Sequence, residues 1–201
     1  MRILVLTPTE RENRNMLAAL DKAASTVNDY TVVLCGIGKA CAAASTARAL
    51  CTSAEGFDMI AVVGYAASAS GRRQGEVVMP SVARYHDCVI PDGFIPEMTD
   101  PYALQGCDDD IVFTGDSFVD AGIIGEVKRR FGCRRALFDM EITAVCQTAA
   151  MMGQVPVVAV KMISDVPECG DTEHSYDEFA DSHTDFSVFV ERLEQLAAVG
   201  R

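Results

Sequence analysis

Charged residues interrupt a stretch of the sequence that is otherwise apolar. The segment 134–165, RRALFDMEITAVCQTAAMMGQVPVVAVKMISD, contains Asp139, Glu141, Lys161 and Asp165. Asp165 follows the apolar run 155–164 directly, with Ser164 before it. A carboxyl group in a partly dry position tends to have a raised pKa and can then deliver a proton at neutral pH. These residues favour acid–base chemistry on a small polar molecule, although a simple binding domain would also fit them.

Asp139 and Glu141 flank Met140 where a predicted strand passes into a predicted helix. One or both carboxylates could cap the helix N-terminus, whose partial positive charge favours a negative group. The segment GIGK at 36–39 invites a nucleotide-binding interpretation, but it lacks the third glycine of GxGxxG and the length of a P-loop. It is a weak phosphate motif, and the simpler interpretation is a tight turn into a helix of small residues that packs close to the sheet.

Short apolar runs rich in Val and Ile alternate with segments of helical periodicity. The predicted strands are 2–6, 31–35, 59–63, 76–85, 111–113, 135–138 and 155–164, and the predicted helices are 10–22, 39–53, 120–131, 141–152 and 175–197. Strands buried on both faces read as continuous apolar runs, and their alternation with helices predicts an α/β fold with a mostly parallel, covered sheet. Ligands bind beyond the C-terminal ends of such strands, where TPTERE, GIGK, GYAAS and ISD follow four of them.

Composition limits the classes of function. With 201 residues and 49% hydrophobic content, we expect residues 1–201 to form a single domain. The net charge of −12 and the lack of a basic cluster argue against nucleic acid and anionic membranes as partners. Eight cysteines without CxxC spacing favour a reduced, cytoplasmic setting. The apolar run ILVL is too short for a signal peptide or a membrane span. The segment 86–110 reads as an irregular excursion that covers a site or a partner subunit.

Five short motifs point to a family. They are GIGK before an Ala-rich helix, TGDSF at 114–118, DME at 139–141, ISD at 163–165 and YDEF at 176–179. In order and approximate spacing they resemble the nucleoside phosphorylase/nucleosidase superfamily, most closely its 5′-methylthioadenosine/S-adenosylhomocysteine nucleosidases. The resemblance spans nearly the whole chain. It implies a three-layer α/β/α sandwich around a mixed, partly barrel-like sheet, a homodimer, a small nucleoside as substrate, and no metal or organic cofactor.

The resemblance also implies a role for individual residues. Asp165, oriented by Ser164, would protonate N7 of the leaving adenine, and Glu12 would activate the attacking water. Glu141 would hold the ribose hydroxyls, with Met140 against the sugar. An acid on the purine side and a carboxylate on the sugar side suit the cleavage of an N-glycosidic bond, which builds negative charge on the purine and positive charge on the ribosyl carbon.

Further residues would contact the purine. Phe118 would stack on it, the backbone of Val119 would read its edge, and Tyr176 would close over it. Lys161 stands where related enzymes carry Arg or Lys. The charged residues of the segment 134–165 would therefore converge on one pocket.

The loop GYAAS departs from the family pattern, which resembles Ser-Ala-Gly-Gly. Tyr65 and Ala66 of this loop belong to the expected substrate site. The bulky ring of Tyr65 either intrudes on the sugar or water position or turns into the core. We prefer the pocket position, because the residue follows an apolar strand at the edge where ligands collect.

Alternative activities remain open within the resemblance. The nearby DGF is similar to futalosine hydrolases, but that group tends to have Asn where this chain has Asp165. A phosphorylase needs cationic phosphate ligands near the first strand, where TPTERE supplies carboxylates that repel phosphate. A non-catalytic nucleoside-binding protein would result if Tyr65 disabled the water position.

Overall fold

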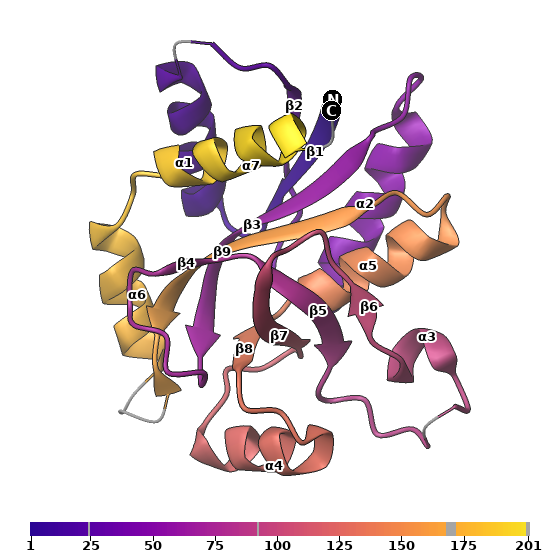
Figure 1. Cartoon of the computed structure of the whole chain (residues 1–201), viewed down its shortest axis with the longest axis vertical. Coiled ribbons are helices and arrows are strands. Elements are labelled where there is room, and N and C mark those ends of the chain that lie inside the picture. The colour runs from indigo at the N-terminus through magenta and orange to yellow at the C-terminus, as the bar shows by residue number, and fades with distance from the viewer. Residues whose placement is uncertain (24, 92, 168–171, 200–201) are drawn as a thin grey trace.

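The computed structural model describes residues 1–23, 25–91, 93–167 and 172–199. Its strands belong to one mixed sheet (Figure 1). They are β1 (Arg2–Thr7), β2 (Asp29–Leu34), β3 (Met59–Ser68), β4 (Val77–Val78), β5 (Pro80–Tyr85), β6 (Tyr102–Ala103), β7 (Asp108–Thr114), β8 (Ala136–Asp139) and β9 (Val157–Asp165). The main path runs β2-β1-β3-β8-β7-β5-β6, and β9 pairs with β3 and β4. That residues 1–201 form one domain stays a prediction.

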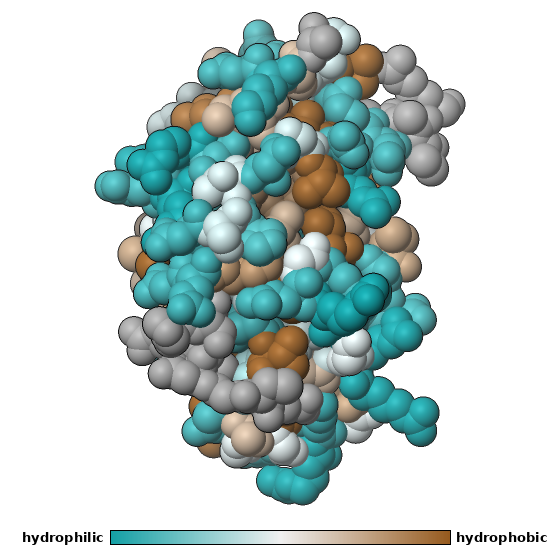
Figure 2. Space-filling model, turned by 90° about the vertical axis from the view of Figure 1, so that its left-hand side faces the viewer, coloured by the Kyte–Doolittle hydropathy of each residue, from teal (hydrophilic) through white to brown (hydrophobic). Residues whose placement is uncertain are grey.

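Helices cover both faces of this sheet. They are α1 (Glu10–Lys22), α2 (Lys39–Thr52), α3 (Pro96–Thr99), α4 (Ala121–Phe131), α5 (Ile142–Met151), α6 (Thr172–Ser182) and α7 (Ser187–Val199). Figure 1 shows α1, α6 and α7 on one side of the sheet and α2 and α5 on the other. The predicted α/β class with three layers around a mixed sheet is therefore confirmed. On the side that carries α1, α6 and α7, the surface is mostly hydrophilic, with apolar residues in small patches (Figure 2).

The central strands bury side chains on both faces, which explains their continuous apolar sequences. In β1, Leu4 and Leu6 join a core cluster with side chains of α2 and α5. The alternate residues Ile3 and Val5 join a second cluster with side chains of α1, α6 and α7. The strands β3 and β9 alternate between the same two clusters.

The predicted strand 76–85 is wrong as a single element. It consists of β4, which pairs with β9, and β5, which pairs with β7. The break falls at Met79 and Pro80. Proline has no backbone N–H to donate to a ladder, so it is suited to the first position of a strand rather than to its interior.

The predicted helix 175–197 is also wrong as a single element, because the chain turns between α6 and α7 at residues 183–186. Asp185 marks the new start, since its Oδ1 accepts hydrogen bonds from the N–H and hydroxyl of Ser187. The segment 86–110 is less irregular than expected, as it contains α3, β6 and the start of β7.

At its end, β3 pairs with two different strands, β8 and β9. Up to Ala66 this strand pairs in parallel with β9, and a register shift follows between Ala66 and Ala67. Ala67 then lies opposite both Asp165 of β9 and Phe138 of the antiparallel strand β8. The end of β3 therefore lies between β8 on one edge and β9 on the other.

The structure adds two observations on the wider properties of the chain. Its described cysteines are free. Among the described helices, none combines the length and the apolar composition needed to cross a bilayer.

Candidate active site

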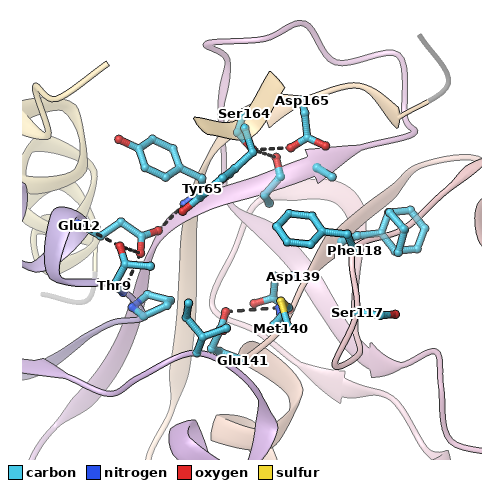
Figure 3. Close-up of a pocket in the computed structure, with 17 residues that line it drawn as sticks. Thr9, Glu12, Tyr65, Ser117, Phe118, Asp139, Met140, Glu141, Ser164 and Asp165 are labelled. Carbon is cyan, nitrogen blue, oxygen red and sulfur yellow. Dashed lines mark hydrogen bonds between the residues drawn. The ribbon is translucent and has the colours of Figure 1, made fainter. Parts of the chain in front are cut away.

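A cavity of about 180 Å³ opens at the end of β3, where this strand pairs with both β8 and β9 (Figure 3). Its size is comparable to a cavity of about 150 Å³ that holds benzene, so a flat heterocycle fits. The predicted site residues that line it are Glu12, Tyr65, Ala66, Phe118, Val119, Met140, Glu141, Ser164, Asp165 and Tyr176. The fold thus brings together all of the predicted site residues except Lys161.

Asp165 is a buried carboxyl group with one oxygen free. Its Oδ1 accepts a hydrogen bond of 2.6 Å from the hydroxyl of Ser164, whereas its buried Oδ2 has no partner among the described residues. Burial raises the pKa of Asp165, and the hydrogen bond from Ser164 opposes that shift in part. Buried polar atoms are normally hydrogen-bonded, so an unpartnered oxygen at a cavity wall is suited to a ligand.

Glu12 lies at another end of the cavity (Figure 3). It completes a capping box at the start of α1, in which its Oε2 accepts hydrogen bonds from the N–H and hydroxyl of Thr9. Its Oε1 accepts the N–H of Tyr65 at 3.0 Å. Gly64 makes this contact possible, because a Cβ atom there would collide with Oε1 of Glu12. Burial raises the pKa of Glu12, against the nearby charge of Lys161.

Glu141 is also buried, and its Oε1 accepts the N–H of Gly38 at 2.9 Å. Burial and the neighbouring charge of Asp139 raise the pKa of Glu141 to about 8. The cap of α5 is formed instead by Asp139, whose Oδ2 accepts the N–H of Ile142. Of the two expected caps, the structure therefore shows that of Asp139.

Lys161 does not line the cavity, which corrects the expected substrate contact. It is fully buried. It faces the α2 and α5 layer, because it lies on the same face of β9 as Ala159 and Ile163, which belong to that cluster. Its Nζ lies 3.4 Å from Oδ2 of Asp139. Burial opposes the charge on Lys161, but the carboxylates around it raise its pKa overall. Lys161 is a buried counter-charge for the carboxylates of the site.

The GIGK segment is a turn whose last two amides, those of Gly38 and Lys39, are already occupied. Gly38 has φ of 89°, and its N–H donates to Glu141. The next N–H, of Lys39, donates to Oδ1 of Asp116 at 2.8 Å. Because carboxylates of the chain occupy the start of α2, the tight-turn interpretation is confirmed.

Aromatic and apolar side chains form the rest of the wall. The rings of Phe118 and Tyr176 meet edge to face, with centroids 6.1 Å apart. Phe118 is 51% exposed, so one side of its ring is open to a ligand. Val119 is buried, and Met140 lies near Glu141 (Figure 3).

The ring of Tyr65 points away from the cavity, which corrects the preferred interpretation (Figure 3). The ring packs in the core against Tyr176, Phe179 and Phe186. Its hydroxyl donates to the carbonyl oxygen of His183 at 2.7 Å. Odd-numbered residues of β3 face the layer of α1, α6 and α7, so strand alternation sets this direction.

Several lining residues were not predicted. They are Pro8, Thr9, Ile37, Ala67, Ser117, Phe138 and Asp139, the last of which was expected only as a cap. Each adjoins or belongs to a motif at the end of a strand, so the neighbours of those motifs were the available signal. Among the described residues, those that line the cavity include no Lys, Arg or His. No metal-binding group of three or more His, Cys, Asp or Glu side chains occurs in the described ranges.

Comparisons with known proteins bear on the fold that carries this site. Residues 111–198 match the family model described as the phosphorylase superfamily. The whole chain resembles solved 5′-methylthioadenosine/S-adenosylhomocysteine nucleosidases. The S. pneumoniae protein has a TM-score of 0.79 at 22% identity. The alignment covers 99% of this chain and 100% of the S. pneumoniae chain. This chain has the fold of these solved nucleosidases.

Two further solved structures support the same fold. The Neisseria meningitidis nucleosidase, in complex with methylthio-immucillin-A, has a TM-score of 0.77 at 21% identity and covers 98% of both chains. The Helicobacter pylori nucleosidase has a TM-score of 0.80 at 18% identity, with the same coverage. No curated protein matches the chain. The expected resemblance to the superfamily is confirmed, and at these identities it establishes the fold.

Proposed function

We propose that this chain is a purine nucleosidase, which hydrolyses the N-glycosidic bond of nucleosides of the 5′-methylthioadenosine/S-adenosylhomocysteine type. The observation that carries this proposal is the buried Oδ2 of Asp165, which has no partner among the described residues and lies in an apolar cavity, with the carboxylate of Glu12 at another end. The solved structures with the same fold that are nucleosidases for these substrates support it.

The reaction divides between the two ends of the cavity. Asp165 gives its proton to N7 of the purine, so that adenine leaves as a neutral molecule. Glu12 accepts a proton from the water whose oxygen bonds to C1′ of the ribose. General acid and general base catalysis contribute about 10²–10⁴-fold each. The raised pKa of Asp165 keeps it protonated at higher pH than an exposed Asp.

The remaining lining residues bind and orient the nucleoside. Glu141 accepts hydrogen bonds from the ribose hydroxyls, and Met140 packs on the sugar. Phe118 and Tyr176 enclose the purine, while Val119 presents its backbone to the purine edge. Transition-state charge is held by side chains of this chain, and the reaction needs neither a metal nor an organic cofactor.

Water is the nucleophile rather than phosphate. The described lining residues include no Lys, Arg or His that would bind a phosphate dianion, and Glu12, which the reaction uses as a carboxylate, would repel it. The ring of Tyr65 is directed into the core, which leaves room for the water and argues against a non-catalytic binding protein.

Adenine release from methylthioadenosine, measured with and without phosphate, tests the proposal. We expect equal rates in both conditions and free thioribose as the second product. Release that requires phosphate would assign a phosphorylase instead. Turnover of futalosine but not of methylthioadenosine would assign the related hydrolase, and binding without turnover would assign a nucleoside-binding protein.

We also propose that the protein is a cytoplasmic homodimer of single-domain chains. Exposed apolar side chains near the cavity mouth and in the segment 86–110, such as Ile37, Val89 and Phe94, are consistent with a partner surface. Light scattering at micromolar concentration distinguishes a dimer from a monomer.

A further inference from the structure

We propose that Tyr65 is a positioning residue, which holds α6 and therefore Tyr176 against the cavity. The inference rests on the proposed function, because it concerns how the purine part of the site is kept in place. Tyr65 stands where the family pattern has a small residue, so this arrangement is a property of this chain.

The ring of Tyr65 contacts two aromatic side chains of α6. Its centroid lies 5.9 Å from those of Tyr176 and Phe179, with edge-to-face geometry in both pairs. Its hydroxyl donates to the carbonyl oxygen of His183, just past the end of the helix. Residues 176 and 179 are spaced by three and share one helix face, so a single ring contacts two neighbouring side chains of that face.

The backbone of Tyr65 belongs to the other half of the site. Its N–H donates to Oε1 of Glu12 at 3.0 Å. Tyr65 lies in β3, where it is paired with Met162 of β9, so the sheet holds its backbone. One residue thus connects the proposed base for water to the helix that carries Tyr176.

The ion pairs between α6 and α1 are weaker in kind than these aromatic contacts. Arg11 of α1 pairs with Asp181 at 3.2 Å and with Asp177 at 3.8 Å, and both carboxylates are largely exposed. Ion pairs of this kind contribute little, since solvent screens them. The buried aromatic contacts of Tyr65 are therefore the better candidates for fixing the position of Tyr176.

A purely structural role for Tyr65 makes a different prediction, and Phe186 provides the control. The ring of Phe186 lies 5.5 Å from that of Tyr65 and is fully buried, but Phe186 does not line the cavity. Replacing either ring by leucine should lower the melting temperature. Only Tyr65→Leu should alter the contact of Tyr176 with a purine.

The test is adenine affinity by calorimetry, measured well below the melting temperature of each variant. We expect Tyr65→Leu to weaken adenine binding about tenfold, because an aromatic contact to a base is of that order. Phe186→Leu should stay within about twofold of the wild type. In a double-mutant cycle, Tyr65→Leu and Tyr176→Leu should be non-additive, since Tyr65 acts through Tyr176. For methylthioadenosine, KM should rise more than kcat falls.

Equal loss of affinity in Tyr65→Leu and Phe186→Leu, or unchanged affinity in Tyr65→Leu, overturns the inference while leaving the proposed function intact. A wild-type protein that neither binds adenine nor cleaves nucleosides contradicts the proposed function instead. If Tyr65→Leu does not fold, Tyr65→Phe removes only the hydrogen bond to His183. Amide exchange in residues 176–182 should then become faster while α4 is unaffected, and unchanged exchange there also overturns the inference.

Discussion

Asp165 and Glu141 are both buried carboxyl groups with raised pKa values, but their surroundings suit them to different tasks. Asp165 has one hydroxyl partner and a free oxygen in an apolar wall. Glu141 accepts a backbone N–H and lies near Asp139 and Lys161. A lone carboxyl group keeps its proton for transfer, whereas a carboxyl group among charges can change its ionisation when a ligand arrives.

Asp165→Asn should abolish turnover while leaving the fold and adenine binding largely intact. The amide keeps the shape and can still accept the hydrogen bond from Ser164, but it cannot deliver a proton. We expect kcat to fall by roughly 10²-fold or more, as for the loss of a general acid. Steady-state kinetics and a melting curve on the same sample measure this. More than about a tenth of the wild-type rate would contradict a catalytic role.

Glu141→Gln should flatten the dependence of stability on pH. With a pKa of about 8 instead of 4.5, Glu141 holds in the folded state a proton that the unfolded chain releases between these values. The free energy of unfolding therefore decreases as pH rises through this window, and glutamine removes that contribution. Between pH 5 and 8, we expect the variant to lose less stability than the wild type by on the order of 2 kcal/mol.

Urea unfolding at several pH values measures this difference. The control is Glu10→Gln, which removes an exposed carboxylate from the same chain. Parallel curves for the wild type and Glu141→Gln would show that burial does not raise the pKa of Glu141.

At the residue scale, motif positions were predictable and side-chain directions were not. Asp165, Glu12 and Glu141 follow apolar strands or begin helices, and the ends of such elements meet at one edge of the sheet. The directions of Tyr65 and Lys161 depend on which face of a doubly covered strand each occupies. Both faces are apolar there, so the sequence carries no alternation that distinguishes them.

At the element scale, the loop after β3 is fastened to β7 by one cation. Arg72 pairs with Asp108 at 3.0 Å and with Asp110 at 2.6 Å, and the side chain of Asp110 is fully buried. These bonds attach the loop next to the end of β3 that pairs with both β8 and β9. The same loop reaches β9, where the side-chain amide of Gln74 donates to the carbonyl oxygen of Ser164.

Arg72→Gln should lower the free energy of unfolding by about 3 kcal/mol, because it leaves the buried carboxylate of Asp110 without its counter-charge. For a chain of this size, this corresponds to a decrease of roughly 10 °C in Tm. Calorimetry measures both values. The matched control is Arg73→Gln, which breaks only an exposed ion pair with Glu76 and should change stability by less than about 1 kcal/mol. Similar effects of the two variants would show that Asp110 does not depend on Arg72.

Element types were predictable where periodicity was clear, and their ends were predictable where caps occur. Helix α1 has the predicted bounds, because the motif TPTERE contains Thr9 and Glu12, the two residues of its capping box. The breaks at Pro80 and at residues 183–186 carried recognisable signals, but the flanking apolar residues obscured them. The pairing of the end of β3 with both β8 and β9 had no local signal, because strand pairing is decided by residues far apart in the sequence.

At the scale of the whole molecule, the net charge of −12 produces self-repulsion that salt can screen. We expect Tm at pH 7 to rise by a few degrees between about 20 and 500 mM KCl. Scanning fluorimetry measures the shift. Near the sequence pI of 4.6 the same series should have a smaller effect, and an equal effect at both pH values would exclude screening as the cause.

The pairing of β3 with β9 determines when the cavity first exists. Residues 60–67 pair with residues 157–165, and the cavity also takes a wall from Tyr176 of α6. Contacts between such distant segments close long loops and form slowly. During synthesis from the N-terminus, the chain therefore has no complete cavity until these last segments have left the ribosome. An adenine-like ligand can stabilise only the finished fold, and it cannot assist the early steps of folding.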